Sequence, residues 1–252
     1  MEVNLLLIMN IYKYIVLFFI ISVLRIPSTG SCNDNSVPSD NTIIEWWSNV
    51  PENHEELASV DATSAKKIFL CNREAAFLFK AGLFPAGRNN WDTVIMVRPA
   101  KKQAREISLP PSREHIEIQS FKNIMYVYDL NHDGVSEIEL GSYESGQGIF
   151  EYSYSIVQFD NWNPIILHRI EFSENSGCCG IEEGNCGECH YQDVSWKFVD
   201  FDRDGVDDLI EEIITQQGST RDKLTKTKTN AYYLFKNKKF IKADDTSKLN
   251  LP

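Results

Sequence analysis

The chain has 252 residues, of which 42% are hydrophobic, and a formal net charge of −11 at neutral pH. This length allows one domain or two small ones with a real core. The acidic balance argues against nucleic acid as a partner, because a phosphate backbone would be repelled and no basic groove with interleaved aromatics offsets the charge. The basic run at 221–228 alternates like the solvated face of a strand or loop. We therefore expect no nucleic-acid binding.

The N-terminal region predicts export. Residues 9–24 combine a short basic start with about ten apolar residues, the length of a signal-peptide core and short for a membrane span of roughly 20. We expect a signal peptide over residues 1–31, with Met9 as a candidate start; a single N-terminal anchor is the competing interpretation. Lipidation of Cys32, as in bacterial lipoproteins, and ordinary cleavage near Gly30 are alternatives. The protein is then periplasmic, on the cell surface or secreted, and contacts a membrane only through a lipid anchor.

The next segments in chain order predict a tether, a helix and then strands. Residues 32–41 are polar and turn-rich, as in a flexible tether. Within residues 42–120 we expect a short helix, capped by Asn41 or Thr42 and ended by Pro51, followed by a β-rich part.

From there on, short apolar and alternating runs are typical of strands. Residues 150–157 alternate with period two, and a hairpin turning at Asn237 ends the chain. The prediction is a mainly β protein of antiparallel sheets with minor helical additions.

Two acidic loops have the spacing of a cation site. Each places oxygen-bearing side chains at positions 1, 3, 5 and 9 and glycine at position 6. Alternate side chains then converge on one centre, the carbonyl of position 7 adds an oxygen, and glycine permits the sharp bend. This pattern wraps a hard cation such as Ca²⁺; a pair of ordinary Asp/Asn/Gly turns is the alternative. The predicted ligands are Asp129, Asn131, Asp133, Val135 and Glu137 in the first acidic loop, and Asp200, Asp202, Asp204, Val206 and Asp208 in the second.

The second acidic loop should fill first, because it offers four carboxylates against three. An EF-hand is the competing architecture. Glu211 stands at its position 12 in the second loop, but Leu140 stands there in the first. An EF-hand needs a helix on each side, whereas the entry at 194–199 is β-rich. The exit at 208–217 has apolar residues at helical spacing.

Each acidic loop lies between two strand-like runs. A unit of about 70 residues with such a loop is the size of one propeller blade, and closed propellers need at least about four blades. This chain has room for three, so we expect an incomplete propeller in which residues 121–252 form two β units, each with a calcium loop.

The first loop runs into Glu-Leu-Gly-Ser-Tyr and the second follows Phe-Val, and both resemble the calcium loops of FG-GAP/VCBS repeat proteins, the integrin-α-like family. The resemblance implies that calcium stiffens a β-hairpin. It predicts an exported, non-catalytic binding, adhesion or envelope-associated module, whose partner is a protein, a glycan or an envelope component.

Four of the six cysteines, Cys178, Cys179, Cys186 and Cys189, lie in one Gly-rich segment. An oxidising compartment favours disulfides, and because a bridge between the neighbours would be strained, two cross-pairings remain. Cys186-x-x-Cys189-His190 also matches the c-type haem attachment motif, so a periplasmic electron-transfer protein with covalent haem c is the alternative function. A zinc site is a third option. The two cysteines outside the segment, Cys32 and Cys71, would form a further bridge if Cys32 is not lipidated.

Motifs for catalysis are absent from the sequence. It contains no Gly-x-Ser-x-Gly elbow, phosphate loop, dinucleotide fingerprint or His-Glu-x-x-His. The sequence therefore predicts no catalytic residues.

Overall fold

The computed structural model describes the chain from Ser36 onward, with gaps. The predicted signal peptide at 1–31, including Met9, and the candidate lipidation site Cys32 lie outside the described residues. None of the helices in the described part has the length and apolarity needed to cross a membrane. The described residues are 36–53, 55–84, 93–108, 121–146, 148–177, 179, 187–244 and 249.

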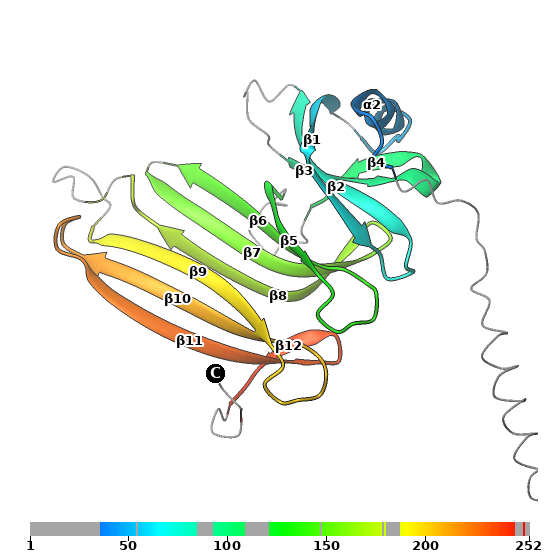
Figure 1. Ribbon diagram of the computed structural model, residues 1–252. Coiled ribbons are helices and arrows are strands. Elements are labelled where there is room, and N and C mark those ends of the chain that lie inside the picture. Colours follow the sequence, from blue (N-terminus) through cyan, green and yellow to red (C-terminus); the bar gives the residue numbers. More distant parts are fainter. Residues whose placement is uncertain are drawn as a thin grey trace, which may run out of the picture. The chain divides into compact units, whose positions relative to one another are not determined.

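Three separate antiparallel sheets make up the described fold, and each is a four-stranded meander in chain order (Figure 1). The prediction of a mainly β protein built from blade-like antiparallel sheets is confirmed. The first sheet contains β1 (Glu56–Phe69), β2 (Ala75–Phe84), β3 (Thr93–Arg98) and β4 (Gln103–Glu106), with the 3-10 turn η1 (Pro99–Lys101) between the last two. The second contains β5 (Asn123–Tyr128), β6 (Glu137–Gly146), β7 (Ile149–Asp160) and β8 (Asn163–Glu174). The third contains β9 (Cys189–Val199), β10 (Asp208–Gly218), β11 (Thr225–Lys236) and β12 (Lys239–Lys242).

A short helix, α2 (Asp40–Ser48), covers one face of the first sheet. It begins before the predicted cap at Asn41 or Thr42, because Ser39 has extended backbone and its hydroxyl accepts the Thr42 N–H. Ile43 and Trp47, one turn apart, are buried and pack in one apolar cluster with β1 to β4. The helix therefore shields the outer face of the first sheet from water.

Neighbouring sheets also pack their faces against each other in chain order. One apolar cluster lies between the first and second sheets and includes Leu78 and Leu140. Another lies between the second and third sheets and includes Ile156, Leu209 and Phe235. Because alternate residues of a strand point to opposite faces, the second sheet contributes to both clusters. The three sheets therefore stack face to face, as consecutive blades would.

A tryptophan and two arginines also join the first two sheets. Trp162, on the β7–β8 turn, contacts two guanidinium groups of the first sheet, with the Cζ atoms of Arg98 and Arg105 each 5.1 Å from its ring centroid. The buried Arg98 also donates two hydrogen bonds to Glu74, at 2.8 and 2.5 Å. A planar guanidinium can stack on a ring and bind a carboxylate at the same time, so these contacts fix the turn against the first sheet.

A buried carboxylate joins the second and third sheets. Glu211 on β10 lies 2.7 Å from Nε2 of His168 on β8, and it accepts hydrogen bonds from the Trp196 indole and the Tyr233 hydroxyl. Burial raises the pKa of the Glu211 carboxyl, but the bond and charge of His168 outweigh burial and leave that pKa below its ordinary value. Glu211 therefore belongs to the interface between sheets.

The EF-hand alternative is wrong for this chain. The second acidic loop has β9 before it and β10 after it, and these two strands pair antiparallel along their length. The apolar spacing at 208–217 resembles a helix because both faces of β10 are buried at its start, with Leu209 and Ile210 pointing to opposite sides. A doubly buried strand and a helix segment look alike in such a short run.

Candidate metal centre

The first hairpin of every sheet lies at the same end of the stack, and backbone hydrogen bonds connect these hairpins (Figure 1). The N–H of Ser136 donates to the Phe69 carbonyl at 2.9 Å, and the N–H of Asp207 donates to the Leu130 carbonyl at 2.8 Å. Ser136 and Asp207 both occupy position 8 of their acidic loops. Each acidic loop is therefore anchored on the hairpin of the preceding sheet.

The two acidic loops adopt the same backbone conformation. Position 4 has positive φ in both, 56° at His132 and 64° at Arg203, and so does position 6, 78° at Gly134 and 88° at Gly205. A Cβ built on either glycine would meet no atom within 4 Å, so glycine is needed there for its backbone conformation rather than for space. The sequence repeat is therefore also a structural repeat.

The second acidic loop brings three carboxylates together. Oxygen atoms of Asp200, Asp202 and Asp208 all lie within 4.8 Å of one another, the one such group of acidic, histidine or cysteine ligands among the described residues. Asp208 is fully buried and accepts the backbone N–H groups of Phe201, at 3.3 Å, and Phe235, at 2.9 Å. Burial, and then the charge of Asp202, raise the pKa of the Asp208 carboxyl. The donor set is hard and anionic, and it fits a divalent cation.

Asp204 and a lysine complete the surroundings of this loop. The Lys236 ammonium at the end of β11 lies 2.7 Å from the Asp202 carboxylate and also pairs with Asp204. The hydrogen bond from Lys236 to Asp204 lowers the pKa of the Asp204 carboxyl. Lys236 is 32 residues from Asp204 in sequence, and the loop spacing gave no signal of it. The predicted carboxylates of the second loop thus meet around one edge of the hairpin, together with a cation that was not predicted.

The first acidic loop differs at position 9. Glu137 is fully buried and accepts the Leu130 N–H at 2.7 Å and the Gln158 side-chain amide at 2.5 Å. The pKa of the Glu137 carboxyl is raised to about 7, because burial and the charges of Asp133 and Asp129 outweigh the lowering effect of these two hydrogen bonds. Position 9 therefore bonds the N–H of position 2 in both loops, but only in the second loop does it join a described carboxylate cluster.

The other predicted ligands of the first loop stay at its rim. Asp129 accepts the Gly134 N–H at 3.3 Å, and the Asn131 and Asp133 side chains each accept a backbone N–H two residues ahead. The guanidinium of Arg73, from the first sheet, donates to the Asp133 carbonyl at 2.9 Å. These hydrogen bonds stabilise the conformation of the loop.

A cavity of about 600 Å³ opens beside the first acidic loop. Its walls come from the end of β1, from Arg73 and from the loop itself. This volume lies within the range of small-molecule sites, about 300–1,000 Å³. The lining residues are Lys67, Phe69, Arg73, Val127, Tyr128, Asp129, Gly134, Val135 and Ser136.

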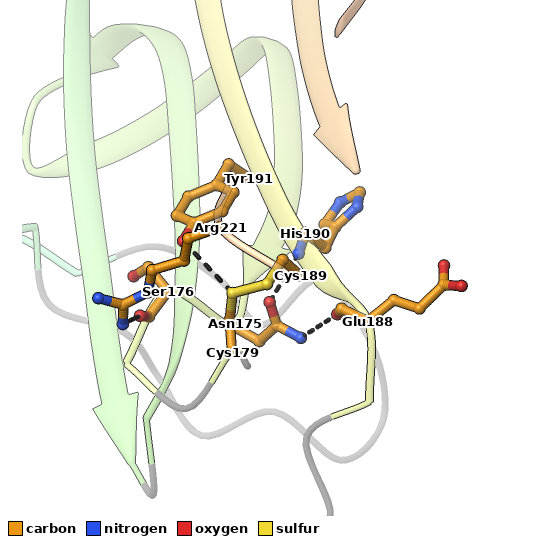
Figure 2. Close-up of a disulfide and its surroundings, with 8 residues drawn as sticks. All are labelled: Asn175, Ser176, Cys179, Glu188, Cys189, His190, Tyr191 and Arg221. Carbon is orange, nitrogen blue, oxygen red and sulfur yellow. Dashed lines mark hydrogen bonds between the residues drawn. A yellow bond between two sulfur atoms is a disulfide. The ribbon is translucent and has the colours of Figure 1, made fainter. Parts of the chain in front are cut away.

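At the opposite end of the sheets, a disulfide joins Cys179 to Cys189, the first residue of β9 (Figure 2). Asn175 holds the two segments together, because its side chain donates to the Glu188 carbonyl and accepts the His190 N–H. Cys178 and Cys186 lie outside the described residues. Haem attachment at Cys186, Cys189 and His190 stays a sequence prediction, and it would require Cys189 as a free thiol.

The last predicted bridge also falls partly outside the described part. Cys71, on the β1–β2 turn, is a partly buried free thiol, and burial raises its pKa.

Comparisons with family models, curated proteins and solved structures give no match to this chain.

Proposed function

We propose that this is an exported calcium-binding β protein in which Ca²⁺ stiffens the two acidic hairpin loops of a stacked-sheet scaffold. The convergence of Asp200, Asp202 and Asp208 in a loop of calcium-binding spacing is the observation that supports it most. Three like charges this close repel one another, and burial of Asp208 strengthens that repulsion. A divalent cation would remove both costs.

In this proposal, the side chains of positions 1, 3, 5 and 9 and the carbonyl of position 7 hold the ion. In the second loop the side chains are Asp200, Asp202, Asp204 and Asp208, and the carbonyl is that of Val206. In the first they are Asp129, Asn131, Asp133 and Glu137, with the carbonyl of Val135. The carboxylate of Glu137, which accepts an internal hydrogen bond in this structure, would then bind the ion directly or orient a residue that does. The ion supplies positive charge and rigidity, and no reaction.

We further propose that the stiffened end of the stack is a binding or adhesion surface for a protein, a glycan or an envelope component. The cavity beside the first acidic loop supports this, because Asp129, Gly134 and Val135 belong both to the loop and to the cavity wall. Calcium in the first loop would therefore fix the shape of that wall. The loop spacing also supports our assignment of the chain to the FG-GAP/VCBS type of repeat.

Thermal melting with and without calcium tests the proposal. Extracellular modules bind calcium at about 10⁻⁴ to 10⁻³ M, and a site at 100-fold saturation adds roughly 2.7 kcal/mol to the free energy of unfolding. For a domain of this size we expect Tm to rise by about 5–10 °C in excess calcium over chelator.

Two variants of the second loop provide the matched comparison. Asp202→Asn removes a carboxylate of the cluster, whereas Asp207→Asn removes one charge from position 8 of the same loop, where only the backbone N–H makes a contact that we identify. Asp202→Asn should lose a large part of the calcium-induced shift, and Asp207→Asn should keep it. Equal melting of the unmodified protein in calcium and in chelator would refute the proposal.

A further inference from the structure

The second acidic loop already holds a cation of its own, the ammonium of Lys236. Lys236 is the last residue of β11, and the N–H of its neighbour Phe235 donates to Asp208, the buried carboxylate of the loop. The end of β11 and the loop between β9 and β10 therefore meet at one place in the third sheet (Figure 1). This attachment sets the lysine against the loop.

The lysine uses the same oxygens that a metal would need. Oδ2 of Asp202 bonds the ammonium, while Oδ1 accepts the Asp204 N–H. Oδ2 of Asp204 also bonds the ammonium, while Oδ1 accepts the Val206 N–H. Each of the four side-chain oxygens at positions 3 and 5 thus already accepts one hydrogen bond, and a divalent cation bound there would lie beside the positive charge of Lys236, which repels it.

The first acidic loop has an acid where the second has this lysine. Ile138 and Leu209, which follow the two loops, pair with Val157 and Tyr233 in the third strand of their sheets. Three residues further along those strands stand Asp160 and Lys236, each followed by an asparagine with positive φ. This place in the second sheet thus carries an acid, whereas in the third sheet it carries the ammonium that pairs with Asp202 and Asp204.

We propose that Lys236 is a built-in competitor for calcium at the second acidic loop. It neutralises the loop when metal is absent and leaves its carboxylates when metal enters, so it weakens and tunes calcium binding there. This inference rests on the proposed calcium function and adds a regulating residue to it. It also alters the expected order of filling, because the advantage of four carboxylates over three is offset by one tethered positive charge.

Calorimetric titration with CaCl₂ tests the competition. The background carries Asp129→Asn and Asp133→Asn, so that the second loop is the remaining site. In this background Lys236→Met should tighten calcium binding about three- to tenfold, since partly exposed ion pairs are worth a few tenths to one kcal/mol each. Lys236→Arg, which keeps the charge, should bind calcium no more tightly than the background chain. Lys226→Met removes a charge from the exposed far end of the same strand and should also change nothing.

The outcomes separate the competition from the calcium function itself. Tighter binding by Lys236→Met alone supports the competitor role, as does binding that appears only when this lysine is removed. Equal binding by the background chain and Lys236→Met overturns the role while the calcium function stands. If neither chain binds calcium, the second loop is not a calcium site, and both the competitor role and the proposal of calcium in the two loops fall. Melting in chelator checks that each variant is folded, and Lys236→Gln replaces Lys236→Met if the methionine chain does not fold.

Discussion

Glu137 should make the metal-free protein less stable as the pH rises through neutrality. Its carboxyl is fully buried, and its pKa is raised from the ordinary 4.5 to about 7. The folded state therefore binds the proton more tightly than the unfolded state does. Between these two pKa values the folded state holds more protons, so the free energy of unfolding falls as the pH rises and levels off above about 7. The difference corresponds to roughly 3 kcal/mol, at about 1.4 kcal/mol for each tenfold change in proton affinity.

Replacing the acid by its neutral amide isolates this effect. Glu137→Gln keeps the side-chain length and an oxygen for the Leu130 N–H, but it cannot ionise. In chelator we expect the variant to match the unmodified protein at pH 5 and to exceed it by about 2–3 kcal/mol at pH 8, slightly less than the full cost because charged acceptors make stronger hydrogen bonds. Urea unfolding at several pH values in the presence of chelator measures both chains.

The comparison with a second variant excludes general effects of pH. Glu144→Gln changes an exposed acid on the same strand, β6, and its difference from the unmodified protein should not vary between pH 5 and 8. If the difference for Glu137→Gln is also constant over that range, the reasoning about the buried carboxyl is refuted.

Three further changes test the contacts between the sheets by urea unfolding. His168→Ala should cost about 2–3 kcal/mol near neutral pH, since it leaves the buried Glu211 with only Trp196 and Tyr233 as donors. That cost should shrink in acid, because the stabilisation from a carboxyl of lowered pKa is present above its ordinary pKa and is lost as the pH falls. Trp162→Ala should cost about 2–4 kcal/mol, since a half-buried ring leaves two guanidinium groups without their stacking partner. Replacing Cys179 and Cys189 together by serine should cost about 2–3 kcal/mol, in proportion to the short loop that the bridge closes.

Each of these changes has an outcome that would contradict the structure. A cost for His168→Ala that stays constant down to pH 4 would exclude the ion pair as its source. Unchanged stability of Trp162→Ala would mean that the β7–β8 turn does not fix the first two sheets together. For the serine double variant, stability equal to that of the unmodified protein under oxidising conditions would show that the bridge does not form in solution.

The local features of this fold were predictable, because they depend on residues close in sequence. Period-two alternation predicted β7, and the Asp/Asn/Gly spacing predicted both loops with a bend at the glycine of position 6. The first sheet gave no repeat signal, because its β1–β2 turn at 70–74 has the sequence Leu-Cys-Asn-Arg-Glu in place of an acidic loop. All three sheets therefore share one topology, but only the second and third share a recognisable sequence repeat.

The contacts that decide the chemistry of the loops come from distant strands. Gln158 and Lys236 stand on the third strands of their sheets, and only the pairing of the hairpins brings them to Glu137 and Asp202. No spacing rule for a short loop includes such residues. The sequence thus predicts which oxygens a loop offers, but not which of them face the interior or a neighbouring lysine.

A calcium titration of chelator-stripped protein tests the central claim most directly. Calorimetry should show saturable binding that approaches two ions per chain, and only one ion after Asp200→Asn and Asp202→Asn are introduced together. Absence of saturable heat up to millimolar calcium, the upper end for extracellular modules at about 10⁻³ M, would contradict the claim.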